Sequence, residues 1–179
     1  FVISEKNIPD IQYLNGIRYK AISHLENLPT LDQLPVKTVE WTPTKKLKNH
    51  YSSFDAIIGH NLAKQACALS IAGNHPMLFI GSPGIGKTLL IDHMKTLQLP
   101  LSNNAAIENC CIDSLLKNDY KFDSMPPFRI PHHTISYAGM IGGQNPPKPG
   151  EITLANHGIL FLDELGEYQR SILETLREP

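Results

Sequence analysis

Two short runs of uninterrupted apolar residues stand out from an otherwise mixed chain. Met77–Ile80 lies between Pro76 and Gly81, and Ile159–Leu162 follows much later in the sequence. Runs of this length predict strands that are buried on both faces in a parallel sheet. Helix-compatible sequence follows each run, so the order strand, helix, strand, helix predicts an α/β domain.

Helical periodicity and turn residues predict further elements. Apolar residues spaced along 62–72 fit one face of a helix, which Gly73 and Asn74 end. A second short helix is expected at 171–176. Residues 141–150 are too rich in Gly and Pro for a helix interior, so they predict an exposed turn or hairpin tip.

The beginning of the chain has a different pattern. Residues 1–28 contain two apolar runs separated by a possible helical turn from Ile8 to Leu14 and by Gly16, which predicts a piece of a βαβ unit. Prolines and lysines dominate residues 29–50, which we interpret as a linker before a domain at 51–179. The lysines at 45, 46 and 48 are compatible with a nucleic-acid patch, but more commonly such a segment is simply solvated.

Charge and composition restrict the function classes. Sixteen Lys and Arg residues against seventeen Asp and Glu residues give a net charge of −1, so the whole molecule has no strong attraction for nucleic acid or an anionic membrane. No apolar stretch approaches the roughly 20 residues of a membrane-spanning helix, and no export signal is visible. Three cysteines without a paired spacing fit reduced thiols. We therefore expect a soluble, cytoplasmic protein.

A phosphate-binding loop follows the first apolar run directly. The sequence Gly81-Ser82-Pro83-Gly84-Ile85-Gly86-Lys87-Thr88 satisfies G-x-x-x-x-G-K-[ST] between a predicted strand and a predicted helix. Glycines allow backbone N–H groups to approach phosphate oxygens, and the helix beginning at Lys87 presents its positive end. We expect Lys87 to reach the β- and γ-phosphates and Thr88 to bind Mg²⁺, with Leu89 also in the binding segment. The alternative is a glycine-rich turn that binds nothing.

Two acidic residues end the second apolar run. Asp163 and Glu164 follow it directly, at the edge of a parallel sheet where ligands bind. Asp163 is expected to hold Mg²⁺ through water, and Glu164 to activate the attacking water. Their alternative role is to cap the following helix. The nucleotide hypothesis requires the two apolar strands to lie side by side, so that Lys87 and both acids surround one triphosphate.

Several stretches together resemble the ComM/YifB group of magnesium-chelatase-like AAA+ ATPases. The resemblance covers residues 54–178 and rests on the phosphate loop and on four further stretches, namely Ile58–His60 with Ala63–Lys64, Pro127–Thr134, Pro147–Ala155 and Leu160–Leu165. It implies a P-loop NTPase sheet with flanking helices, ATP and Mg²⁺ as cofactors, and adenine contacts at Ile58 and Gly59. Intact members of the group form hexameric rings that move DNA branches during transformation.

The resemblance also implies what the chain lacks. Residues 1–28 resemble the end of a Lon-protease-like N-terminal domain, and the sensor 1 strand, arginine finger and lid of an AAA+ module have no counterpart here. We therefore expect a fragment truncated at both ends. Two alternatives stay open: a non-catalytic nucleotide-binding remnant, and a chelatase-type subunit that inserts Mg²⁺ into a porphyrin.

Other candidate residues remain without an assigned role. The resemblance places Lys148 in an insert that faces the ring channel and a DNA backbone, but a plain surface hairpin is equally compatible. His132 and His133 lack a partner at metal-ligand spacing, which favours a structural or partner-facing role. Arg129 is compatible with a catalytic cation or an ordinary ion pair.

Overall fold

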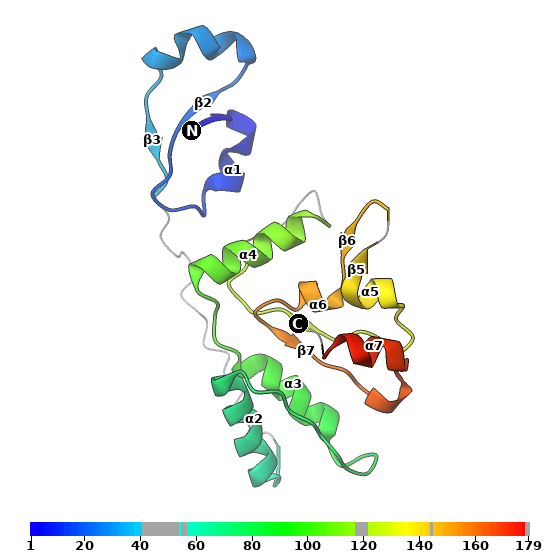
Figure 1. The fold of residues 1–179 in the computed structure, drawn as a ribbon. Coiled ribbons are helices and arrows are strands. Elements are labelled where there is room, and N and C mark those ends of the chain that lie inside the picture. The colour runs from blue at the N-terminus through cyan, green and yellow to red at the C-terminus, as the bar shows by residue number, and fades with distance from the viewer. Residues whose placement is uncertain (41–53, 55–56, 117–121, 144, 178–179) are drawn as a thin grey trace. The chain divides into compact units, whose positions relative to one another are not determined.

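The computed structural model describes residues 1–40, 54, 57–116, 122–143 and 145–177. The chain divides into two compact units, Phe1–Asn49 and His50–Pro179 (Figure 1). The three lysines at 45, 46 and 48 lie outside the described residues.

The first unit is built on a small parallel strand pair. Strand β1 (Val2–Ser4) continues through the 3-10 helix η1 (Glu5–Asn7) and helix α1 (Ile8–Ile11) to strand β2 (Arg18–Ile22). The two strands pair in parallel, with Val2 opposite Lys20. Gly16 precedes β2 with a φ of 79°, a value that suits glycine. The predicted βαβ piece is therefore confirmed.

The linker predicted for residues 29–50 differs from the structure in its first part. The 3-10 helix η2 (Leu25–Gln33) includes Pro29, and strand β3 (Lys37–Thr38) pairs antiparallel with β2. Prolines suggested a linker because they break α-helices and interior strands, yet a 3-10 helix and the start of an edge strand both accept them. The first unit thus includes these residues.

The second unit begins with a helix pair. Helix α2 (Asn61–Gly73) packs against α3 (Lys87–Leu97), and α4 (Asn103–Ser114) follows. Asn74 ends α2 in the left-handed conformation, as the Gly73-Asn74 pattern predicted. Buried residues from α2, α3 and the segment before α2 form the first apolar cluster: Ile57, Cys67, Leu90 and Met94.

The strand predicted at Met77–Ile80 does not form, so that prediction is wrong. The segment is extended but has no pairing partner among the described residues. Met77 and Phe79 pack on the first apolar cluster, whereas Leu78 and Ile80 are 65% and 89% exposed. A continuous apolar run predicted burial on both faces, but packing against two helices covers only alternate side chains.

A second parallel strand pair lies in the other part of this unit. Strand β4 (Phe128–Arg129) pairs with β7 (Ile159–Leu160), with Phe128 opposite Ile159. Among the described residues β7 pairs with β4, and no pairing joins it to Met77–Ile80, so the expectation that the two apolar runs lie side by side is not confirmed. Only the first two residues of the predicted strand are paired.

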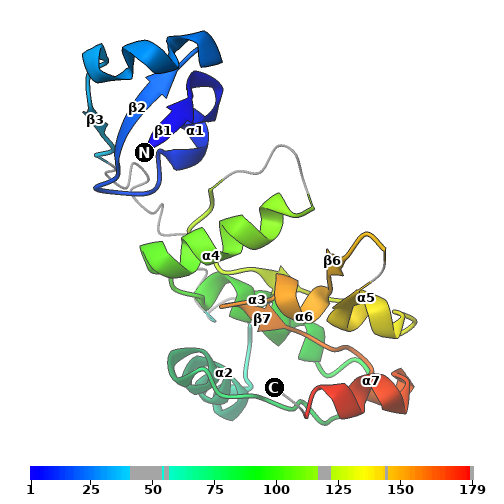
Figure 2. The ribbon, with the colours of Figure 1, turned by 45° about the horizontal axis from the view of Figure 1, so that its top comes forward.

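A hairpin and short helices connect β4 to β7. Helix α5 (Tyr137–Ile141) leads into strand β5 (Gly142–Gly143), which pairs antiparallel with β6 (Lys148–Pro149) before helix α6 (Glu151–Leu154). The predicted hairpin is confirmed, and it stands out from α5 and α6 in both views (Figure 1, Figure 2). Its Gln144 lies outside the described residues.

The end of the described chain packs on this second half. After β7 come the 3-10 helix η4 (Leu165–Glu167) and helix α7 (Arg170–Thr175). Met140, Tyr168 and Ile172 form the second apolar cluster, against which Ile135, Leu160 and Leu162 also pack. Mixed helices and strands of this kind fit an α/β fold. Among the described residues, no helix is long and apolar enough to span a membrane.

Gly158 tests the packing at the start of β7. A Cβ atom added there would lie 2.0 Å from the backbone oxygen of Pro127, which itself accepts the N–H of Ile159. We expect Gly158→Ala to lower the free energy of unfolding by about 1–3 kcal/mol or more, because the backbone at Pro127 or Gly158 must shift to make room for the methyl group. Urea unfolding measures this value.

Gly166 provides the matched control, since a Cβ atom there would meet nothing within 4 Å. Gly166→Ala should stay within about 0.5 kcal/mol of the wild type. Equal stability of the Gly158→Ala protein and the wild type would contradict the described approach of β7 to Pro127.

Candidate nucleotide-binding site

The glycine-rich loop joins the extended segment 77–80 to helix α3. Gly84 and Gly86 have φ values of 79° and 92°, in the left-handed region that side chains disfavour. Gly86 is the N-cap of α3, and the helix begins at Lys87, as predicted. The loop therefore ends at a helix N-terminus, whose first N–H groups have no partner within the helix.

Lys87 folds back over this loop. Its Nζ donates hydrogen bonds to the backbone oxygens of Gly81, at 2.8 Å, and Ser82, at 2.9 Å. The remaining predicted loop residues, Ser82, Pro83, Gly84, Ile85, Thr88 and Leu89, are exposed. An ammonium group, free N–H groups and the positive end of a helix thus gather at one accessible place, a combination that suits an anion.

The first apolar cluster positions this loop and the segment before α2. Leu90, in the first turn of α3, and Ile57 are both buried in that cluster. Lys64 on α2 donates a hydrogen bond from Nζ to the Ile57 oxygen, which fixes the chain just before Ile58. Ile58 is 95% exposed, and Gly59 turns the chain with a φ of 76°. The predicted adenine segment and phosphate loop are thus anchored in one cluster.

The acidic residues follow β7 on an exposed turn. Asp163 accepts a hydrogen bond at Oδ1 from the backbone N–H of Glu164, at 3.0 Å. Glu164 has a φ of 51°, an uncommon left-handed conformation for a side-chain-bearing residue. Its Oε2 lies 3.6 Å from Nδ1 of His133. The Asp163 carboxylate is therefore held by its own turn, whereas the Glu164 carboxylate faces a residue that follows β4.

The predicted site residues fall into two groups. Lys87 and Thr88 belong to the loop anchored in the first apolar cluster, whereas Asp163 and Glu164 follow a strand that packs on the second. Within the part of the chain that the structure describes, no hydrogen bond or ion pair joins Lys87 to either acid. The joint arrangement of amine and acids stays a prediction.

Two residues hold the acidic end: His133, for which the sequence favoured a structural or partner-facing role, and Tyr168, which the sequence did not single out. His133 meets Glu164, and the Tyr168 hydroxyl donates a 2.6 Å hydrogen bond to the oxygen of Pro131. Burial raises the pKa of Tyr168, and the nearby Asp163 charge raises it further. Neither contact can be predicted from the neighbouring sequence, because each joins residues about thirty or more positions apart. Both contacts depend on the pairing of β4 with β7.

Arg129 makes an ordinary ion pair. Its Nε and Nη2 each donate a 2.7 Å hydrogen bond to the Glu151 carboxylate, which ties β4 to α6. The hydrogen bond to Glu151 raises the pKa of the guanidinium. Arg129 thus fixes the base of the β5–β6 hairpin, and it has a structural partner within this chain.

Metal binding by protein groups alone has no support in the described part of the chain. No three His, Cys, Asp or Glu side chains there gather as a metal site. A hydroxyl at Thr88 and a carboxylate at Asp163 fit a different arrangement, in which Mg²⁺ keeps water and phosphate ligands and takes few from protein. Cys67, Cys110 and Cys111 form no disulfide bonds.

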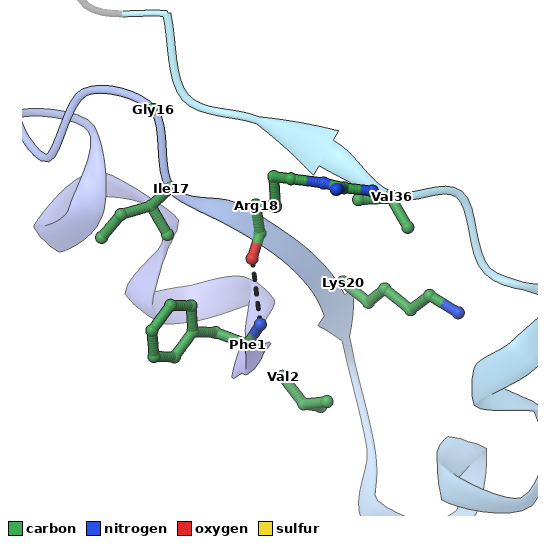
Figure 3. A pocket seen from close by; sticks show the side chains of 7 residues that line it. All are labelled: Phe1, Val2, Gly16, Ile17, Arg18, Lys20 and Val36. Carbon is green, nitrogen blue, oxygen red and sulfur yellow. Dashed lines mark hydrogen bonds between the residues drawn. The ribbon is translucent and has the colours of Figure 1, made fainter.

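Two hollows in the described part of the chain are lined by other residues. One of about 640 Å³ belongs to the first unit and is lined by Phe1, Val2, Gly16, Ile17, Arg18, Lys20 and Val36 (Figure 3). It is open to solvent and has apolar and cationic walls without a nucleophile or acid. Another, of about 310 Å³, lies between α4, α6 and residues 123–127. Neither includes the phosphate loop or the acidic turn.

Comparison with known proteins identifies relatives across the whole chain. Residues 53–179 match the family described as magnesium chelatase, subunit ChlI. The competence protein ComM of Haemophilus influenzae is 45% identical over 125 residues, which are 69% of this chain and 25% of ComM. The uncharacterized protein YifB of Escherichia coli is 45% identical over 181 residues, which are 99% of this chain and 36% of YifB. The chain therefore spans about a quarter to a third of these relatives.

Removal of the Tyr168 hydroxyl should destabilise the second unit. Tyr168→Phe leaves the Pro131 oxygen without its buried donor, so we expect a loss of about 1–3 kcal/mol in the free energy of unfolding. The exposed Tyr137 gives the control, and Tyr137→Phe should change stability by less than about 0.5 kcal/mol.

Alkaline titration gives a second readout of the same residue. A raised pKa in the fold means that Tyr168 contributes stability below about pH 10 and loses it as the pH rises through the folded pKa. Wild-type stability should therefore fall more steeply in that range than that of Tyr168→Phe. Parallel curves would show that the hydroxyl is not buried.

Loss of the Arg129 guanidinium should also be costly. Arg129→Ala leaves the largely buried Glu151 carboxylate without its two donors, so we expect about 1.5–3 kcal/mol of destabilisation in thermal or urea unfolding. Arg170→Ala removes an exposed i,i+4 pair with Glu174 and should cost at most about 0.5 kcal/mol. Similar losses in both variants would contradict a structural role for the Arg129 pair.

Proposed function

Because this chain belongs to the ComM/YifB group of magnesium-chelatase-like proteins, we propose that it binds Mg-ATP as part of a AAA+ ATPase. The observation that carries the proposal is the glycine-rich loop at the start of α3. Gly84 and Gly86 adopt positive φ values there, and the Lys87 amine lies over the loop. These features supply the donors and positive charge that a triphosphate requires.

Each residue has a role that its chemistry allows. Gly81–Thr88 would surround the phosphates with N–H groups, while Lys87 exchanges its two carbonyl partners for phosphate oxygens. Thr88 and Asp163 would hold Mg²⁺, which neutralises phosphate charge when bound. Glu164 would orient the attacking water and accept its proton. Ile58 and Gly59 would contact adenine, for which the exposed Ile58 side chain offers an apolar surface.

The use of hydrolysis is inferred from the relatives. One relative is named a competence protein, which supports a role in handling incoming DNA. We propose that an intact hexameric ring, located in the cytoplasm, moves DNA branches and that the β5–β6 hairpin with the exposed Lys148 faces the DNA. The first unit would then be the end of a Lon-protease-like domain, in keeping with its parallel β1–β2 pair.

A second candidate is nucleotide binding without hydrolysis. It is favoured by the two separate anchoring clusters, since Lys87 and the acids have no recorded contact in the described chain. The third candidate is a chelatase-type subunit, because the family that this chain matches is described as magnesium chelatase, subunit ChlI. ATPase activity distinguishes the second candidate, and porphyrin-dependent Mg²⁺ insertion the third.

Two substitutions test the nucleotide site. Lys87→Ala should weaken binding of a fluorescent ATP analogue with Mg²⁺ by at least roughly 100-fold, because the positive charge on the phosphates is lost. Glu164→Gln should retain binding and lose turnover, because an amide does not accept the water proton.

Lys95→Ala is the matched control for charge, since Lys95 is an exposed lysine later on the same helix. It should bind the analogue as the wild type does. Undiminished affinity of the Lys87→Ala protein would overturn the proposed site, and binding without turnover in the wild type would favour the second candidate.

A further inference from the structure

The loop after β4 meets the acidic turn after β7. These strands are parallel and paired, so their carboxyl ends lie at the same edge and the residues that follow them are neighbours. Nδ1 of His133 lies 3.6 Å from Oε2 of Glu164, within ion-pair range but beyond a hydrogen bond. An imidazole from one strand end therefore faces the carboxylate from the other.

The surrounding contacts hold His133 in this place. Tyr168, buried in the second apolar cluster, anchors the loop through its hydrogen bond to Pro131. The ring of His132 lies against that of His133, with centroids 4.1 Å apart, and Nδ1 of His132 is bonded to the Thr134 hydroxyl. Tyr168 thus holds the loop at Pro131, and the His133 ring packs against its neighbour His132 within the loop.

The Glu164 side chain has little else to restrain it. Its side chain is 66% exposed, and in the described part of the chain its carboxylate has His133 as its one recorded partner. The hydrogen bond to Asp163 fixes the Glu164 backbone N–H and leaves the side-chain torsions free. Loss of the imidazole would therefore release the carboxylate to sample several rotamers.

We propose that His133 is a positioning residue that orients the Glu164 carboxylate toward the water used in ATP hydrolysis. This inference rests on the proposed ATPase function. The contact suits the role because His133 approaches only Oε2 of Glu164, and a carboxylate has further acceptor sites that stay available to a water molecule. His133 acts through Glu164 and does not itself touch the nucleotide.

The contact can be tested without nucleotide. In the full chain, His133→Ala should shift the side-chain carboxyl ¹³C resonance of Glu164, because the neighbouring imidazole ring is gone. His157→Asn is the control, since it breaks a second His–Glu pair, with Glu108, and keeps a residue that tolerates the positive φ of 57°. An unchanged Glu164 resonance in His133→Ala would overturn the proposal.

Turnover then tests the role. His133→Ala should lower kcat roughly tenfold with unchanged KM for Mg-ATP, because a misplaced base slows the chemical step without weakening binding. His133→Gln, whose amide donates a hydrogen bond at similar reach, should restore most of kcat, and His157→Asn should leave kcat unchanged. Equal kcat in His133→Ala and the wild type, or no rescue by Gln, would overturn the positioning role.

The same assays test the positioning role of His133 separately from the proposed ATPase function. A wild-type chain that fails to bind the ATP analogue overturns the proposed function itself, whatever the Glu164 resonance does. A wild type that binds and hydrolyses ATP, together with an unaffected His133→Ala protein, overturns only the positioning role.

Discussion

The burial of Leu90 beside Ile57 is the packing constraint on which the candidate site depends. Leu90 fixes the first turn of α3, and with it the direction in which the glycine-rich loop presents its N–H groups. Ile57 fixes the chain immediately before the exposed Ile58. One cluster of packed side chains, which are apolar apart from the Cys67 thiol, therefore sets both ends of the surface that a nucleotide would cover.

A separate set of contacts holds the acidic half of the candidate site in place. Parallel pairing of β4 with β7 places the residues after both strands at one edge, and Tyr168 fastens the loop between them to the second apolar cluster. The Arg129–Glu151 pair ties the same strand to α6 and so to the hairpin. The acidic turn, the paired histidines and the hairpin are thus mechanically connected, while the phosphate loop is anchored elsewhere.

The sequence predicted best those features that a few adjacent residues determine. Positive φ values at Gly84 and Gly86, the start of α3 at Lys87, the end of α2 at Asn74 and the β5–β6 hairpin all follow from local backbone preferences.

Features that depend on a distant partner were missed. Met77–Ile80 was expected to be a paired strand, but its composition alone does not supply a neighbour. The partner of β7 is β4, only two residues long, which has no apolar run to reveal it. Contacts such as His133 with Glu164 depend in turn on that pairing.

The hydrogen bonds of Lys87 have a consequence for ligand entry. Its amine donates to the backbone oxygens of Gly81 and Ser82, so the loop is held in shape by its own cation. A triphosphate bound as proposed would compete with the backbone for that amine, so its affinity would be the difference between two sets of hydrogen bonds and smaller than the contacts in the complex alone would suggest. Binding of phosphate by Lys87 would thus be an exchange, in which phosphate oxygens replace the peptide oxygens of Gly81 and Ser82 as acceptors.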